Sequence, residues 1–297
     1  MNFIQENAVL EVSDKKGLFY DMLKRIITAI VAVIILLPIL WFSETYVFTI
    51  AIAIVSCISL FEIFSCLGFK TKFSVTLPAY IIAIAVPIWG KYAGGAIALM
   101  PTVCAALMLY IFYLLALSVI CHSRYSIHEL AVCYITSVYI ICGFSSIQFL
   151  REMSSNIYLL VFIGAWVTDI FAYFTGVFFG KHKLCETISP KKTIEGSLGG
   201  IVFCSLAFVA FGLFAGQGRV EIYEYIILAV IGIIISVVSQ IGDLSMSLIK
   251  RHYGIKDFGK IFPGHGGMLD RFDSIIAVSS VLFILLSALK SFNIIIF

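Results

Sequence analysis

The stretch Ile26 to Phe42 reads IITAIVAVIILLPILWF and contains no charged residue. Its apolar side chains cover every face of a helix, whereas a soluble amphipathic helix carries them in one stripe with a period of 3.6 residues. Similar apolar runs recur along the chain, and roughly twenty such residues cross a bilayer core of about 30 Å. The sequence therefore predicts an integral membrane protein and argues against a large soluble helical core.

The whole composition agrees with this interpretation. Of the 297 residues, 61% are hydrophobic and only 12% are charged, and the mean hydropathy is +1.08. We predict an all-α, polytopic membrane bundle of about nine transmembrane helices, near residues 25–42, 45–67, 74–89, 94–121, 128–149, 157–180, 197–216, 222–249 and 274–296. The third candidate is short and contains Pro78 and Pro87, so we expect it to be kinked or partly re-entrant.

Lysine and arginine predict the orientation. If the N-terminus lies inside, sixteen of the twenty Lys and Arg residues fall on cytoplasmic segments, as the positive-inside rule requires. Residues 1–24 are then a polar cytoplasmic segment, and because no small-residue cleavage pattern follows the first apolar run, we expect that run to remain as an anchor. The two richest polar loops, 181–196 and 250–273, fall on the cytoplasmic side.

The two halves of the chain differ in polarity. Residues 25–156 form predicted N-terminal transmembrane helices with few charges, whereas residues 157–297 hold nearly every group that can do chemistry and form a predicted catalytic region. The net charge of +3 and the absence of a basic stripe with interleaved aromatic residues argue against a nucleic-acid partner. The eight cysteines form no CxxC pair and are interpreted as small apolar residues.

Carboxylates inside apolar runs are the first candidate functional groups. Asp169 and Asp243 lie within predicted spans, where an ionisable group is costly unless it is paired, hydrated or bound to a cation. On a helix, Asp243, Ser247 and Lys250 share one face. A structural hydrogen bond for Asp169, and a helix end reaching the surface for Lys250, are the competing interpretations. For Glu62, near the end of the second span, structural and functional roles are equally open.

The loop Glu186 to Gly200, ETISPKKTIEGSLGG, is the first of two polar loops of interest. It combines Lys191 and Lys192 with the hydroxyl groups of Ser189 and Thr193 and with several glycines. Ammonium groups, hydroxyls and free backbone amides together can hold phosphate oxygens. A solvated positive loop is the simpler alternative, but it does not explain the hydroxyls and glycines beside intramembrane carboxylates.

The second polar loop, Ile255 to Ser274, reads IKDFGKIFPGHGGMLDRFDS. A helix that begins near Asp270 places Asp270 and Asp273 on one face, where they repel each other unless a cation lies between them. Carboxylate oxygens together with substrate phosphates are typical Mg²⁺ ligands. Arg271 can pair with a phosphate or a carboxylate, and the glycines around His265 let the backbone approach a ligand closely. These groups favour a Mg²⁺-dependent reaction of a phosphate compound with a lipid.

At these residues the sequence resembles the phosphatidate cytidylyltransferases, or CDP-diacylglycerol synthases. The segment Ser247 to Asp273, SLIKRHYGIKDFGKIFPGHGGMLDRFD, fits the signature of that family. The matching positions are Lys250, Arg251, Lys256, Asp257, Gly259, Pro263, His265, Gly266, Gly267, Asp270, Arg271 and Asp273. The blocks DIFAYFTGVFFGKHKL and ISPKKTIEGSLGG are also similar to family blocks. The resemblance covers roughly residues 160–280.

The resemblance implies the reaction CTP + phosphatidate → CDP-diacylglycerol + pyrophosphate, within phospholipid biosynthesis, with Mg²⁺ or another divalent cation. It also implies about nine helical spans, a polar cavity open to the cytoplasm and a homodimer. We therefore expect a multi-pass protein of a bacterial-type inner (cytoplasmic) membrane, with the N-terminus and the active site on the cytoplasmic side.

Individual roles follow as hypotheses. Asp243 and Asp270 are the predicted principal metal ligands, with Asp273 and Asp169 in support. The groups predicted to neutralise or contact phosphate charge are Lys191, Lys192, Lys250, Arg251 and Arg271. Ser189, Thr193, Gly266 and Gly267 are predicted to bind and orient the substrates. His265 is either a phosphate contact or a proton carrier.

Two other classes remain possible from the residues. A transporter could use Asp169 and Asp243 as an ion path, although that leaves the Gly-His-Gly-Gly stretch without a role. A different lipid enzyme, such as a CTP-dependent polyprenol kinase, is the other class. A CDP-alcohol phosphotransferase would need a DGxxAR…GxxxDxxxD pattern, which this chain lacks.

Overall fold

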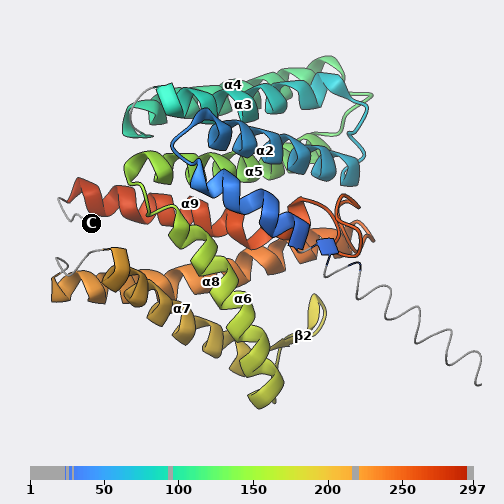
Figure 1. Ribbon diagram of the computed structural model, residues 1–297. Helices are drawn as coiled ribbons and strands as arrows, with labels where there is room; N and C mark the ends of the chain where they lie inside the picture. The colour runs from blue at the N-terminus through green and yellow to red at the C-terminus, as the bar shows by residue number, and fades with distance from the viewer. Residues whose placement is uncertain (1–23, 25–26, 29, 93–95, 216–220, 293–297) are drawn as a thin grey trace, which may run out of the picture.

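A computed structural model describes residues 24, 27–28, 30–92, 96–215 and 221–292 of the chain. Its helices are α2 (Tyr46–Cys66), α3 (Phe73–Tyr92), α4 (Ala96–Ile120), α5 (Ile127–Met153), α6 (Leu159–Phe179), α7 (Ile194–Ala215), α8 (Ile222–His252) and α9 (Leu269–Ser291). A shorter apolar helix, Ile30–Trp41, precedes them. One hairpin, β1 (Lys183–Cys185) with β2 (Ser189–Thr193), lies between α6 and α7. Figure 1 shows the arrangement.

The predicted all-α membrane architecture is confirmed. Within the described residues, eight helices are long and apolar enough to cross a membrane. The first predicted span corresponds to Ile30–Trp41, and several of the residues before it lie outside the described part of the chain. The third candidate was expected to be short and kinked or re-entrant, but α3 is one helix of 20 residues that contains both Pro78 and Pro87. Transmembrane helices tolerate proline because neighbouring groups satisfy the freed backbone carbonyls.

Helix α9 lies at the centre of the bundle, between α5 on one side and α8 on the other. Close packing brings these helices together. A Cβ atom on Gly143 of α5 would lie 2.1 Å from a side-chain carbon of Ile276, and one on Gly242 of α8 would lie 2.6 Å from the Ala277 side chain. Small residues allow such approaches between membrane helices. The central helix is thus held by both halves of the chain.

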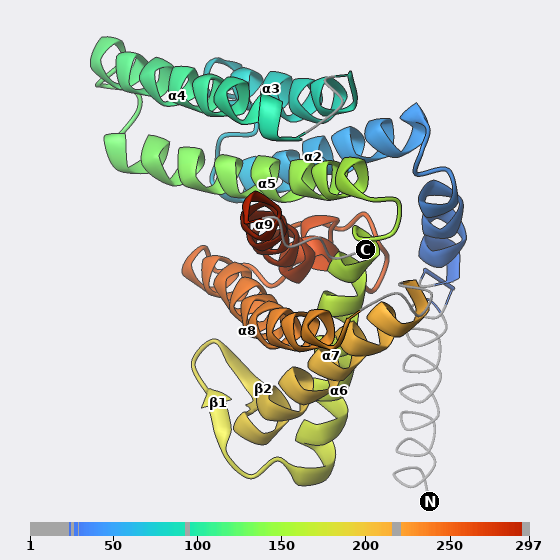
Figure 2. The ribbon, with the colours of Figure 1, turned by 90° about the vertical axis from the view of Figure 1, so that its left-hand side faces the viewer.

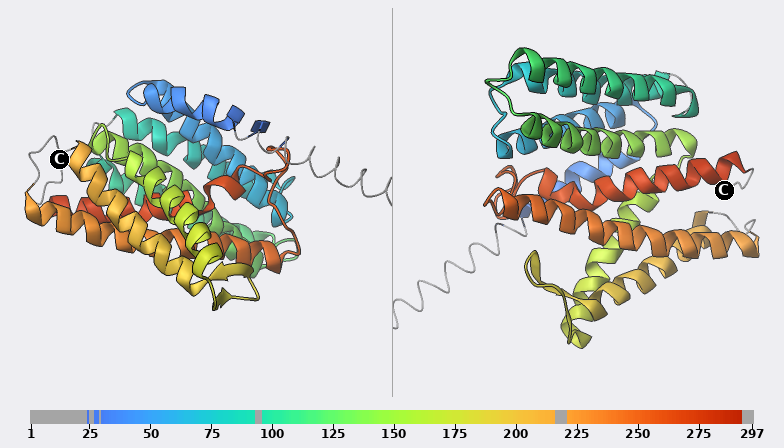
Figure 3. Two further views of the ribbon diagram at one scale, coloured as in Figure 1. Left: turned by 60° about the horizontal axis from the view of Figure 1, so that its bottom comes forward. Right: turned by 180° about the vertical axis from the view of Figure 1, so that it is seen from behind.

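Helix α6 crosses α7 and α8 at a steep angle and carries the chain to the hairpin (Figures 2 and 3). Its contact with α7 is again close, because a Cβ atom on Gly196 would lie 2.5 Å from the carbonyl oxygen of Ala172. The C-terminal ends of α6 and α8, the hairpin and the start of α9 therefore gather at one end of the bundle (Figure 1). Both polar loops predicted from the sequence, 181–196 and 250–273, lie at that end.

Candidate active site

The hairpin is anchored to the bundle by Glu195 in the first turn of α7. Its carboxylate accepts hydrogen bonds from the backbone amides of Lys181 (3.0 Å) and His182 (3.2 Å), and the His182 ring nitrogen Nδ1 lies 2.6 Å from the other oxygen. Thr193 Oγ1 accepts a hydrogen bond from the amide of Gly196 at 3.1 Å. Both ends of the hairpin are therefore fixed, and the strand β2, which holds the paired lysines, has a defined position over the bundle.

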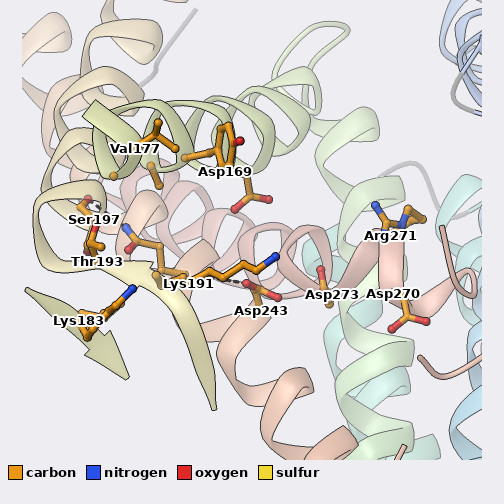
Figure 4. A pocket seen from close by; sticks show the side chains of 16 residues that line it. Asp169, Val177, Lys183, Lys191, Thr193, Ser197, Asp243, Asp270, Arg271 and Asp273 are labelled. Carbon is orange, nitrogen blue, oxygen red and sulfur yellow. Dashed lines mark hydrogen bonds and ion pairs between the residues drawn. The ribbon is translucent and has the colours of Figure 1, made fainter. Parts of the chain in front are cut away.

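Beneath the hairpin lies a cavity of about 620 Å³, which we call the first cavity. It is lined by Asp169, Ala172, Tyr173, Gly176, Val177, Lys183, Leu184, Lys191, Lys192, Thr193, Ser197, Gln240, Asp243, Asp270, Arg271 and Asp273. Figure 4 shows the carboxylates of Asp169, Asp243 and Asp273 reaching this cavity from the three helices α6, α8 and α9. The structure thus brings together groups that lie up to about a hundred residues apart in the sequence.

The cavity is balanced in charge. Four cationic side chains, Lys183, Lys191, Lys192 and Arg271, face four carboxylates across it. Lys192 forms an ion pair with Asp243. Asp273 is almost buried and accepts a hydrogen bond from the amide of Ser274 at 2.8 Å. A polyphosphate that enters this space with a divalent cation meets positive side chains for its oxygens and carboxylates for the cation.

Asp270 is more tightly held than the other carboxylates. One of its oxygens lies 2.8 Å from Lys250 Nζ, and the other accepts hydrogen bonds from the amides of Phe258 (2.8 Å) and Gly267 (2.9 Å). Lys250 and Asp270 are 9% and 7% exposed, so the pair is buried. Lys250 therefore lies against Asp270 and does not line the first cavity, where the sequence had suggested a direct phosphate contact.

Glu62, left open by the sequence, caps the start of α9. Its oxygens accept hydrogen bonds from the amides of Met268 (2.9 Å) and Leu269 (2.7 Å), and the residue is 3% exposed. Glycine is required beside it, because a Cβ atom on Gly259 would lie 2.1 Å and one on Gly267 2.4 Å from a Glu62 oxygen. A negative group at a helix N-terminus is favourable. Glu62 thus orients the turn that carries Asp270.

The loop between α8 and α9 surrounds a second cavity of about 640 Å³, lined by Lys256, Asp257, Gly259, Lys260, Phe262, Pro263, Gly264, His265, Gly266 and Arg271. Arg271 is exposed and lines both cavities. His265 is held at the edge of the second cavity, where its Nδ1 lies 2.7 Å from Thr28 Oγ1. Of the predicted substrate-binding residues, Gly266 lines this second cavity, while Ser189, Arg251 and Gly267 line neither cavity.

Sequence reasoning missed several lining residues. Lys183, Ser197 and Gln240 face the first cavity, and the amide nitrogen Nε2 of Gln240 donates to the carbonyl oxygen of Ser197 at 3.4 Å. A lysine three residues after the end of a predicted span, and a glutamine within another span, are weak signals by themselves. Lys256 and Lys260 were part of the quoted polar stretch, but no pattern in that stretch indicates that they face a cavity of their own.

The donor groups of the first cavity are of the kind that a hard divalent cation takes. Among the described residues, no group of three or more His, Cys, Asp or Glu side chains forms a ready-made metal cluster. Mg²⁺ commonly uses only one or two carboxylates, and substrate phosphates and water complete its coordination. The four carboxylates that line this polar cavity, Asp169, Asp243, Asp270 and Asp273, include groups that fit that mode of binding.

Comparisons with known proteins identify the family of the chain. The model of the cytidylyltransferase family matches residues 23–289. A protein named phosphatidate cytidylyltransferase from Staphylococcus haemolyticus is 37% identical over 264 residues, which cover 88% of this chain and 98% of that protein. Proteins of the same name from Staphylococcus aureus and Staphylococcus epidermidis are 37% and 36% identical, with the same shares covered. The chain belongs to the cytidylyltransferase family.

Proposed function

We propose that this protein is a phosphatidate cytidylyltransferase, which converts CTP and phosphatidate into CDP-diacylglycerol and pyrophosphate for phospholipid biosynthesis. The observation that carries the proposal is the first cavity. It places Asp169, Asp243 and Asp273 opposite Lys183 and Lys191 at one end of a membrane bundle. Family membership and the names of the relatives support the same reaction.

The reaction is a transfer of the cytidylyl group. A phosphate oxygen of phosphatidate attacks the α-phosphorus of CTP, and the bond to the bridging oxygen breaks so that pyrophosphate leaves with the electron pair. No covalent bond to the protein is needed. Catalysis then consists of positioning the two substrates and neutralising the charge that develops on the phosphate oxygens. Lys183, Lys191 and Arg271 supply that positive charge from the walls of the first cavity.

Asp243 and Asp270 remain the proposed principal ligands of a divalent cation, with Asp169 and Asp273 in support. Bound there, Mg²⁺ would neutralise phosphate oxygens and help pyrophosphate to leave. Each principal carboxylate is now paired with a lysine, Asp243 with Lys192 and Asp270 with Lys250. If one divalent cation replaced the ammonium groups of Lys192 and Lys250 at these two carboxylates, the net charge around the carboxylates would not change. The replacement would also release Lys192, which lines the cavity, for phosphate oxygens.

The decisive measurement is phosphatidate-dependent release of pyrophosphate by the purified protein in detergent, with CTP and Mg²⁺. We expect Asp243→Asn to lower kcat at least about a hundredfold, as losing a preorganised electrostatic group does, without a large change in unfolding temperature. Glu186→Gln removes a carboxylate from the exposed hairpin turn, outside the first cavity, and serves as the matched control. An Asp243→Asn protein with full activity at limiting Mg²⁺ would refute the metal assignment.

Absence of pyrophosphate release from folded wild-type protein, with any lipid phosphate, would refute the proposed reaction. The polar cavity would then favour a transporter, and ion flux through reconstituted vesicles would be the next measurement.

We also propose that the end of the bundle with both cavities faces the cytoplasm and that the protein is a homodimer. The crowding of lysine and arginine at that end supports the orientation, and the family resemblance supports the dimer. Protease cleavage of the hairpin only in inside-out vesicles is the expected result for the orientation. A mass of two chains by light scattering in detergent is expected for the dimer.

A further inference from the structure

The second cavity differs from the first in its charge. Three cationic side chains, Lys256, Lys260 and Arg271, line it together with one carboxylate, Asp257. Within the described part of the chain, neither lysine forms an ion pair or a side-chain hydrogen bond, and both are exposed. The excess of positive charge here favours an anion on its own, whereas the charge-balanced first cavity favours an anion that brings a cation with it.

Arg271 connects the two cavities, because it is the one residue that the two sets of lining residues share. It follows Asp270, whose carboxylate is fixed by Lys250 and two backbone amides. The backbone of Arg271 is therefore held in the first turn of α9 between the two spaces. In a reaction that joins two phosphate groups, the phosphates of the two substrates must come into contact. A guanidinium group, which has five N–H donors, can bind both of them at once.

Apolar surface adjoins the second cavity. Thr28 donates from Oγ1 to the carbonyl oxygen of Pro263 and lies against the ring of His265. On either side of Thr28, Ile27 and Ile30 are 52% and 54% exposed, and Ile261 in the loop itself is 49% exposed. Exposed isoleucines at the start of a membrane helix suit contact with lipid tails. A ligand with an anionic head and an apolar body therefore fits this edge of the molecule.

We propose that Lys256, Lys260 and Arg271 form a separate subsite for the phosphate monoester of the lipid substrate, while the nucleotide and its metal ion occupy the first cavity. This inference rests on the proposed function and assigns each substrate to its own cavity. A phosphate monoester carries about 1.5 to 2 negative charges near neutral pH, which the excess positive charge of this subsite matches. The attacking oxygen then enters the first cavity past Arg271.

The test separates the two substrates kinetically. We expect Lys256→Gln combined with Lys260→Gln to raise KM for phosphatidate about tenfold or more, since charge-assisted hydrogen bonds to phosphate are lost, and to leave KM for CTP unchanged. Lys191→Gln should do the reverse. The matched control is Lys70→Gln combined with Lys181→Gln, which removes two exposed lysines that line neither cavity.

A short-chain, water-soluble phosphatidate distinguishes binding in the subsite from attraction to an anionic micelle surface. The same rise in KM with this lipid supports the subsite, while a rise confined to micelles overturns it. Product inhibition by pyrophosphate is the second measurement. If the double variant weakens only product inhibition by pyrophosphate, the cavity takes the leaving group and the proposal is wrong.

Equilibrium binding of short-chain phosphatidate without CTP tests the subsite independently of the reaction. Binding by wild-type protein that the double variant weakens about tenfold would support the subsite even if no pyrophosphate were released. Turnover by wild-type protein, with binding that the double variant leaves intact, would overturn the subsite and retain the cytidylyltransferase.

Discussion

The helices before residue 157 and those after it use carboxylates in opposite ways. In the first half, Glu62 is buried and its oxygens are satisfied by two backbone amides of α9. In the second half, Asp169 and Asp243 face an open cavity, and Asp243 forms an ion pair with Lys192 of the hairpin. Asp270 lies between these extremes, since it lines the cavity and is also saturated with donors. Their surroundings therefore indicate which carboxylates support the fold and which are available to a ligand.

The largest expected effect is that of Asp270→Asn, which should damage both the fold and the activity. The substitution leaves Lys250 buried without its negative partner, and breaking a buried ion pair on one side costs about 3–5 kcal/mol. We expect a clear fall in the midpoint of thermal unfolding, measured at a fixed scan rate in detergent, together with loss of pyrophosphate release. Lys250→Met added to Asp270→Asn should restore part of the stability and none of the activity.

Retention of the wild-type unfolding midpoint by Asp270→Asn would show that the pair contributes nothing to folding. Asp270 would then belong with Asp243 as a carboxylate used for function alone.

Glu62→Gln should separate stability from chemistry. A glutamine oxygen can accept from one amide of the α9 turn, but its NH₂ group faces the other amide, and leaving a buried donor unsatisfied costs about 1–3 kcal/mol. We expect a lower unfolding midpoint with kcat per folded molecule close to that of the wild type. A fall in kcat as large as that of Asp243→Asn, in protein of normal stability, would give Glu62 a direct functional role and remove the contrast between the halves.

Glu195→Gln should have the smallest effect and should act through the hairpin. Its carboxylate holds the amides of Lys181 and His182, so the variant loosens the base of the hairpin without touching the cavity wall. We expect KM for CTP to rise a few fold with kcat nearly unchanged, measured from initial rates at saturating phosphatidate. Full retention of KM would show that the hairpin does not need this anchor.

The sequence predicted the architecture because apolar length and uniform hydrophobicity are local properties. The polar end of the bundle could be predicted for the same reason, since the lysine-rich segments alternate with the spans. Two local features were nevertheless missed. The hairpin strand Ser189–Thr193 has no alternation of apolar and polar residues and contains Pro190, and α3 is longer than the predicted span 74–89, with both prolines inside one helix of 20 residues.

The family signature was predictable as a pattern, but its internal contacts were not. Glu62 meets Leu269 across 207 positions of sequence, and nothing in a single sequence specifies such a contact. For a related reason, the sequence did not show that the residues of the signature line two different cavities. Lys256, Lys260 and Arg271 are neighbours in the sequence, yet only the turn of α9 places Arg271 against the first cavity as well.

The cap that Glu62 provides has a consequence for biogenesis. Helix α2 leaves the ribosome long before α9, so during synthesis the six long helices α3 to α8 are made before the backbone amides that pair with the Glu62 carboxylate. The catalytic loop can take its final shape only when α9 has docked between α5 and α8. We therefore expect a nascent chain to stay inactive until α9 is inserted. The carboxylate of Glu62 is made early, and it orients the first turn of α9, which is made late.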